Sequence, residues 1–114
     1  MTKSELKKKY NAIHRTISEI LWIDWDPIGI NDLAPRDEYD DYVPEICSLV
    51  MRNKSAIEIA NRLFQIETDT IGVLGNREHC LKVANKIIDE INRNDKYLSF
   101  IKCLVFEIMH KSCI

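Results

Sequence analysis

The apolar residues of this chain recur at steps of three and four positions, which is the spacing of amphipathic α-helices. Over residues 4–22 this spacing predicts a long first helix, and Thr2 with Glu5 predicts a capping box at its start. The pattern breaks at residues 24–29, where an Asp-Pro step followed by a glycine favours a turn. We expect irregular chain to continue as far as Ala34, which makes this the longest loop.

Two helices are predicted in the middle of the chain. A proline and an acid within residues 35–37 signal the start of a second helix, and Pro44 would lie in its first turn or kink it. Ser55 and Glu58 form a second capping box, which opens a third helix that ends at Gly72. The second helix is expected to present Tyr39, Tyr42, Val43, Ile46, Leu49 and Val50 on one face. The third is expected to bury Ile57, Ala60, Leu63, Phe64, Ile66 and Ile71.

The last third of the chain predicts two more helices. Asn76 caps a fourth that ends around residues 92–94, and Asp95 caps a fifth over about residues 95–112. The fourth is expected to bury Leu81, Ala84, Ile87, Ile88 and Ile91. No segment shows the alternation of a strand, and the short connections make neighbouring helices pack antiparallel or at steep angles. We therefore predict an all-α fold, a single-domain irregular bundle of about five helices over residues 1–114.

The composition is that of an ordinary globular protein. With 114 residues, 46% hydrophobic and 30% charged, the chain is long enough to bury one core and too apolar to be disordered. Its first residues are polar and contain no apolar stretch typical of a signal peptide. No run approaches the ~20 apolar residues that a membrane span needs. We therefore expect a cytoplasmic protein.

The cysteines and histidines do not form a recognisable site. The four cysteines are widely spaced within apolar helical patterns, so we expect free core thiols (Cys47, Cys80, Cys103 and Cys113). No Cys-x-x-Cys pair is present to hold zinc. The three histidines are isolated on different predicted helices (His14, His79 and His110). We therefore predict no metal, no cofactor and no enzyme activity.

Two familiar ligand loops are excluded as well. Residues 24–35 have acids at positions one, three and nine and a glycine at six, as in a calcium loop. However, Ile28 stands at position five, and Pro35 stands at position twelve in place of the bidentate Glu. Only three glycines are present, so no glycine-rich loop can enclose a phosphate. A pI near 5.9 and modest basic clustering argue against nucleic-acid binding.

The charge of the chain is unevenly distributed. Between residues 24 and 45, eight acids accompany one base, Arg36, so this segment carries a net charge of −7 although the whole chain carries −2. The acids are Asp24, Asp26, Asp32, Asp37, Glu38, Asp40, Asp41 and Glu45. One or two acids would complement a helix N-terminus, but four stand within residues 37–41. Two interpretations stay open: a solvated acidic face, or a surface that binds a cationic partner.

Several short motifs carry a resemblance to a known family. They are Trp25-Asp26-Pro27-Ile28-Gly29, Asp37-Glu38-Tyr39-Asp40-x-Tyr42-Val43-Pro44-x-Ile46, Ile59-Ala60-x-x-Leu63 and Ile66-Glu67-x-Asp69-x-x-Gly72. Over about residues 10–91 the chain resembles a small all-helical bacterial family that includes immunity proteins of contact-dependent growth inhibition (CdiI-type). The family has no catalytic motif to carry over. The predicted C-terminal helix lies beyond the resemblance.

The resemblance implies an immunity protein that binds and neutralises a cognate cytoplasmic toxin as a 1:1 heterodimer. A nuclease toxin has a cationic cleft for phosphates, which an acidic surface could occlude. On this hypothesis the partner-binding residues are Asp32, Asp37, Glu38, Asp40, Asp41, Tyr42 and Glu45. The shared residues Asp24, Trp25, Asp26 and Tyr39 are instead expected to build the loop.

Two other functions remain open from the sequence alone. The chain could be a non-enzymatic protein-interaction domain, for example a homodimer formed through the helix after Asp95. A metal-dependent hydrolase ranks third and would require a bound divalent metal. Neither nucleic acid, nor a membrane, nor a small-molecule substrate is expected as a partner.

Overall fold

The computed structural model describes residues 2–29 and 34–93, and within them the chain is all-α with no strand. Four α-helices form this part: α1 (Lys3–Ile20), α2 (Val43–Met51), α3 (Ala56–Gln65) and α4 (Arg77–Asn92). The all-α prediction is confirmed. The described residues contain four helices rather than about five, because the fifth predicted helix lies outside them.

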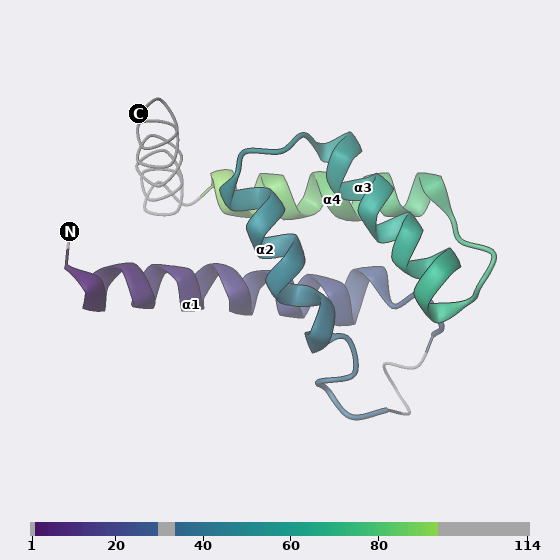
Figure 1. The fold of residues 1–114 in the computed structure, drawn as a ribbon, viewed down its shortest axis with the longest axis horizontal. Helices are drawn as coiled ribbons and strands as arrows, with labels where there is room; N and C mark the ends of the chain where they lie inside the picture. The colour runs from purple at the N-terminus through teal and green to yellow at the C-terminus, as the bar shows by residue number, and fades with distance from the viewer. Residues whose placement is uncertain (1, 30–33, 94–114) are drawn as a thin grey trace.

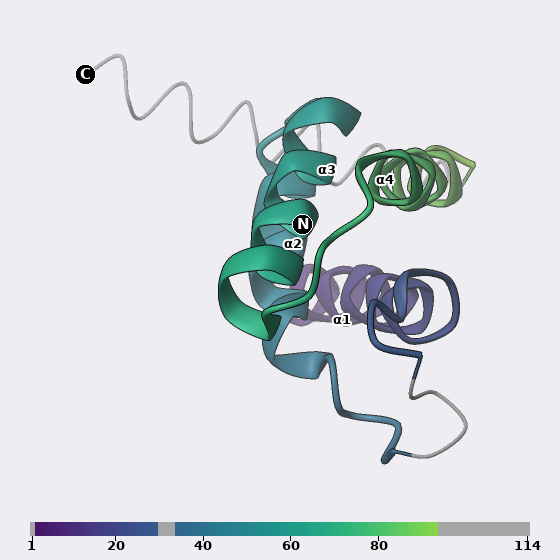
Figure 2. The ribbon, with the colours of Figure 1, turned by 90° about the vertical axis from the view of Figure 1, so that its right-hand side faces the viewer.

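The helices form two layers. Figure 1 shows α1 and α4 running along the length of the molecule, with α2 and α3 crossing in front of them. Figure 2, turned by 90°, shows α1 and α4 nearly end-on as one layer and α2 with α3 as the other. Contacts join α1 to α2, α1 to α4 and α3 to α4, so the four helices enclose one core.

The helix termini follow the polar residues predicted to cap them. Thr2 Oγ1 accepts from the Glu5 amide (3.1 Å), and the Thr2 amide donates to the Glu5 carboxylate (3.4 Å), which completes the predicted box. Ser55 Oγ accepts from the Glu58 amide (3.2 Å) at the start of α3. Asn76 Oδ1 accepts from the backbone of α4 in the same way (3.0 Å). Each bond satisfies an amide that the first helical turn leaves without a partner.

Helices α1 and α3 both end in a wider turn. A π-helical turn prolongs α1 over Leu21–Trp25 (η1), and another prolongs α3 over Ile66–Ile71 (η3). The first helical segment therefore extends beyond the predicted residue 22 and stops at Asp26, which has a positive φ of 30°. The second stops at Gly72, as predicted, with φ +86° in the left-handed region that glycine adopts most readily.

The second helix begins later than predicted. Residues 36–39 form turns, and Asp40–Tyr42 form a single 3₁₀ turn (η2) before α2 starts at Val43. Pro44 then lies in the first turn of α2, where its missing N–H leaves no helical hydrogen bond unmade. The acidic residues thus lie mostly before the helix rather than within it.

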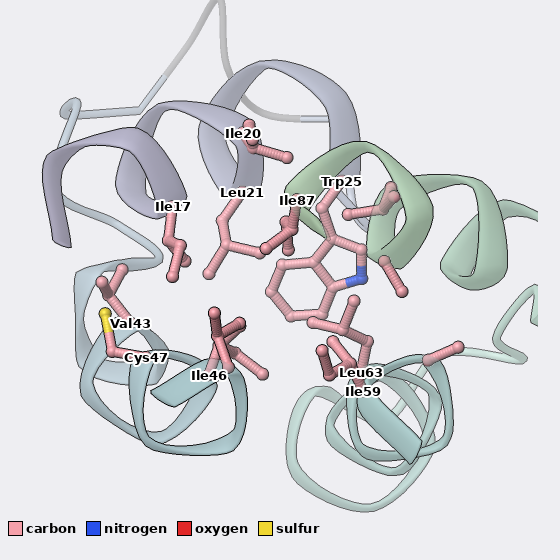
Figure 3. Close-up of a cluster of buried hydrophobic side chains, with 14 of the residues drawn as sticks. Ile17, Ile20, Leu21, Trp25, Val43, Ile46, Cys47, Ile59, Leu63 and Ile87 are labelled. Atoms are coloured by element: carbon pink, nitrogen blue, oxygen red, sulfur yellow. The ribbon is translucent and has the colours of Figure 1, made fainter. Parts of the chain in front are cut away.

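Apolar side chains from all four helices meet around the indole of Trp25, which is 1% exposed. In Figure 3 its ring lies among Leu21 of η1, Ile87 of α4 and the α3 side chains Ile59 and Leu63. Residues from α2 close the other side of the core, among them Val43, Ile46 and Cys47 (Figure 3). The end of α1 is therefore the centre of the fold.

The prediction of burial is wrong for two residues. Ile57 is 64% exposed, because Ile59 occupies the inward position on α3. Leu81 is 38% exposed, because its neighbour Cys80 faces inward on α4. In both cases an apolar residue one or two positions away also satisfied a three-four spacing, so the pattern did not say which one was buried.

Cys47 and Cys80 are buried free thiols, as predicted, whereas Cys103 and Cys113 lie outside the described residues. Burial raises the pKa of the Cys47 thiol to about 12. None of the described helices is long and apolar enough to cross a membrane.

Candidate functional site

Four aromatic rings hold the acidic segment against the end of α1. Trp25 and Tyr39 are buried, as expected for residues that build the loop, and their ring centroids lie 5.5 Å apart. The Trp22 ring packs on Tyr39 (5.9 Å), and the Tyr42 ring meets Trp25 edge-on (5.8 Å). Such tilted and edge contacts are the favoured arrangements of aromatic pairs. Tyr42, a predicted partner-binding residue, is therefore half-buried in this aromatic cluster (Trp22, Trp25, Tyr39 and Tyr42).

Asp26 is a structural residue of the loop. The hydroxyl of Tyr39 donates to its carboxylate at 2.6 Å. Burial, followed by this hydrogen bond, raises the pKa of Tyr39 well above its usual value. The tyrosine therefore stays a neutral donor, and Asp26 joins the end of η1 to the turn before α2.

Two of the predicted partner-binding acids already have partners inside the protein. Ser18 Oγ of α1 donates to Asp40 Oδ1 at 2.8 Å, which holds η2 against α1. Arg62 of α3 donates to both carboxylate oxygens of Glu45, with Nη2 lying 3.1 Å from Oε2. This bidentate ion pair links α2 to α3. Asp40 and Glu45 are thus at least partly engaged in holding helices together.

Three other predicted acids have no such partner. The side chains of Asp37, Glu38 and Asp41 are exposed, and none forms an ion pair with the described part of the chain. We call these three residues the acidic turn. Asp32 lies outside the described residues. The structure therefore divides the predicted surface into an exposed set and a set with internal roles.

A buried acid, Glu67 of η3, was not singled out by sequence reasoning. It is 2% exposed, and its carboxylate accepts from Trp25 Nε1 (3.3 Å), the Asn76 amide (3.2 Å) and Cys80 Sγ (2.8 Å). A buried carboxylate is tolerated only with such partners. Glu67 therefore joins η1, η3 and the start of α4. The available signal was its position four residues after Leu63 and one after Ile66, on the face that the helical spacing predicts to be buried.

Cys80 and His79, at the start of α4, act as hydrogen-bond donors toward Glu67 and the end of η1 respectively. Burial, then the hydrogen bond to Glu67, raises the pKa of the Cys80 thiol to about 12. The ring Nε2 of His79 lies 3.1 Å from the carbonyl oxygen of Trp25, which can only accept, so this nitrogen carries a proton. Cys80 and His79 therefore support the end of η1.

Within residues 2–29 and 34–93, no three Asp, Glu, Cys or His side chains come together as a metal site would require. No protein-family model, curated protein or solved structure matches this chain. The resemblance to the immunity family stays a prediction.

Proposed function

We propose that this protein is a cytoplasmic immunity protein that binds a cognate toxin through an acidic surface and neutralises it by occlusion. The observation that carries the proposal is the acidic turn, in which Asp37, Glu38 and Asp41 stand exposed without an ion pair to the described part of the chain. Adjacent like charges repel one another, and a cationic partner relieves that repulsion.

The chemistry of a nuclease toxin suits such a surface. An enzyme that cleaves RNA or DNA holds phosphates in a cationic cleft. Carboxylates placed in that cleft replace the phosphates, and the opposite charges accelerate association. Inhibition then needs no turnover: a 1:1 complex keeps the nucleic acid out of the cleft.

The contacts of Tyr39 and Asp40, which fix the backbone of the acidic turn, support a binding role. Tyr39 lies between Glu38 and Asp40 in the chain, is 2% exposed and is fixed by its hydrogen bond to Asp26. Asp40 is held to α1 through Ser18. Because this backbone is already ordered, binding loses little conformational entropy.

The test begins with the partner. The tagged protein is used to capture its partner from the native host, and the toxin encoded beside its gene is expressed separately. We expect a 1:1 complex in which the toxin's activity falls with added immunity protein. Replacing all three residues of the acidic turn by lysine should weaken binding at least a hundredfold at low salt and much less at high salt.

A matched control separates local from overall charge. Asp69, Glu78 and Asp89 are exposed acids on other elements, and their replacement by lysine changes the net charge equally. This control should bind nearly as tightly as the wild type. If the folded acidic-turn variant also binds like the wild type, the acidic turn is not in the interface.

The second candidate is a non-enzymatic protein-interaction domain, including a homodimer. Leu74, in the connection before α4, favours it because its side chain is 97% exposed. Light scattering of the purified protein tests self-association. A dimer that Leu74→Ser converts to a monomer, together with no effect on any neighbouring toxin, would replace the immunity proposal.

A further inference from the structure

The base within the acidic segment, Arg36, sits on the aromatic cluster. Its guanidinium carbon lies 5.7 Å from the ring centroid of Trp22, within the range of a cation–π contact. Its Nη1 donates to Ser18 Oγ at 3.4 Å. Ser18 in turn donates to Asp40 at 2.8 Å. An indole face and a hydroxyl thus contact one guanidinium, and the Asp40 carboxylate accepts the hydrogen bond of that hydroxyl.

Arg36 is held weakly in this position. Its side chain is exposed, its hydrogen bond is long, and it forms no ion pair with the described residues although Asp37 is its neighbour in sequence. By contrast, Arg62 binds both carboxylate oxygens of Glu45. Arg36 can therefore leave its place without breaking a strong contact.

We infer that Trp22 and Ser18, whose hydroxyl is oriented by Asp40, form a guanidinium subsite, which Arg36 occupies in the free protein and an arginine of the partner occupies in the complex. The inference rests on the proposed function, since it assumes a cationic partner at the acidic turn. It specifies that the recognised cation is an arginine side chain. It also identifies Arg36 as a residue of this chain that competes with that arginine.

Arginine suits this subsite better than lysine. Its planar guanidinium stacks on an aromatic face while its N–H groups still reach an acceptor beside the ring, such as Ser18 Oγ. A lysine ammonium is compact and strongly hydrated, and cannot make both contacts in one plane. Occupation by Arg36 lowers the apparent affinity for an external arginine in proportion to the time that the subsite is filled.

The test uses the whole protein and two short peptides, acetyl-Gly-Arg-Gly-amide and its lysine counterpart. The indole N–H signal of Trp22 is followed by nuclear magnetic resonance during titration, after assignment with Trp22→Phe. In Arg36→Gln we expect the arginine peptide to bind about two to five times more tightly than in the wild type, as for an exposed cation–π contact. The lysine peptide should gain less than half as much.

Two variants act as controls. Arg52→Gln removes an equal charge from another exposed arginine, at the end of α2, and should leave the affinity at Trp22 unchanged. In the Arg36→Gln background, Trp22→Leu should abolish the preference for arginine. Because this variant has no indole signal at position 22, its binding is followed through the backbone amide signal of Ser18, and circular dichroism checks its folding. The double-mutant cycle isolates the contribution of the ring.

The outcomes for the subsite and for the function are separable. Equal affinities in wild type and Arg36→Gln, equal gains for both peptides, or an unchanged preference after Trp22→Leu would each overturn the subsite. If the subsite binds arginine as expected but reversal of the acidic turn leaves toxin binding intact, the proposed function fails instead.

Discussion

The buried carboxylate of Glu67 and the carboxylates of the acidic turn have opposite surroundings. Glu67 is buried and accepts from an indole, a thiol and a backbone amide. The carboxylates of the acidic turn are exposed and form no ion pair with the described residues. A buried charge must have partners within the fold, whereas an exposed one is solvated and stays available. Glu67 is therefore structural, and the acidic turn is the candidate for function.

The largest expected effect is at Glu67. Replacing Glu67 with Ala leaves the Trp25 indole, the Cys80 thiol and the Asn76 amide without an acceptor, so the free energy of unfolding should fall by about 3 kcal/mol or more. Urea denaturation measures the change. Asp69→Ala, in the same turn but exposed, should change it by less than about 0.5 kcal/mol. Similar losses at both sites would remove the contrast between buried and exposed acids.

Tyr39→Phe should have the next largest effect. The substitution keeps the ring in the aromatic cluster but removes the donor to the Asp26 carboxylate, which should cost about 1.5 kcal/mol because the acceptor is charged. Thermal unfolding followed at 222 nm measures it. An unchanged melting temperature would mean that the hydrogen bond from Tyr39 to Asp26 does not hold the acidic segment in place.

The raised pKa values of the two buried thiols predict that the stability of the protein falls at alkaline pH. Cys47 and Cys80 have a pKa of about 12 in the folded protein, above that of an unfolded cysteine. Their stabilisation is fully present below the unfolded pKa of about 8.5 and is lost as pH rises, because the unfolded chain then binds fewer protons. Each thiol should lower the free energy of unfolding by about 1 kcal/mol between pH 8.5 and 9.5.

Urea denaturation across this pH range, with a reductant present, checks the effect. The slope is the change in the free energy of unfolding per pH unit. Cys47→Ala should reduce this slope by the contribution of one thiol. A slope that is the same in the wild type and in Cys47→Ala would contradict a raised pKa for this buried group.

The smallest effect on stability is expected at the acidic turn. Asp41→Asn should change the free energy of unfolding by no more than about 0.5 kcal/mol, with a sign that favours the folded state because repulsion is relieved. Thermal melts at low and high salt measure it, and the gain should shrink as salt screens the charges. A loss of more than 1 kcal/mol would show that Asp41 has a structural partner.

Local chemistry made much of the fold predictable. The caps at Thr2, Ser55 and Asn76 and the stop at Gly72 depend on hydrogen bonds and backbone angles within a few residues, so they could be read directly. The extension of α1 through Trp25 could not, since it depends on the core into which the indole packs. Nor could the burial of Ile59 rather than Ile57, because both satisfy a helical spacing.

The candidate site likewise has features that the sequence predicts and features that only the tertiary structure decides. The sequence alone determined that residues 24–45 carry an excess of seven negative charges, that aromatic rings accompany them, and that the chain is helical. Only the tertiary structure decided that Asp40 and Glu45 have partners, that Asp37, Glu38 and Asp41 stand exposed, and that Glu67 is buried. Charge and helical spacing are properties of neighbouring residues. The environment of a carboxylate depends on donors such as Ser18, Arg62 and Cys80, which are distant in the chain and meet it only in the folded protein.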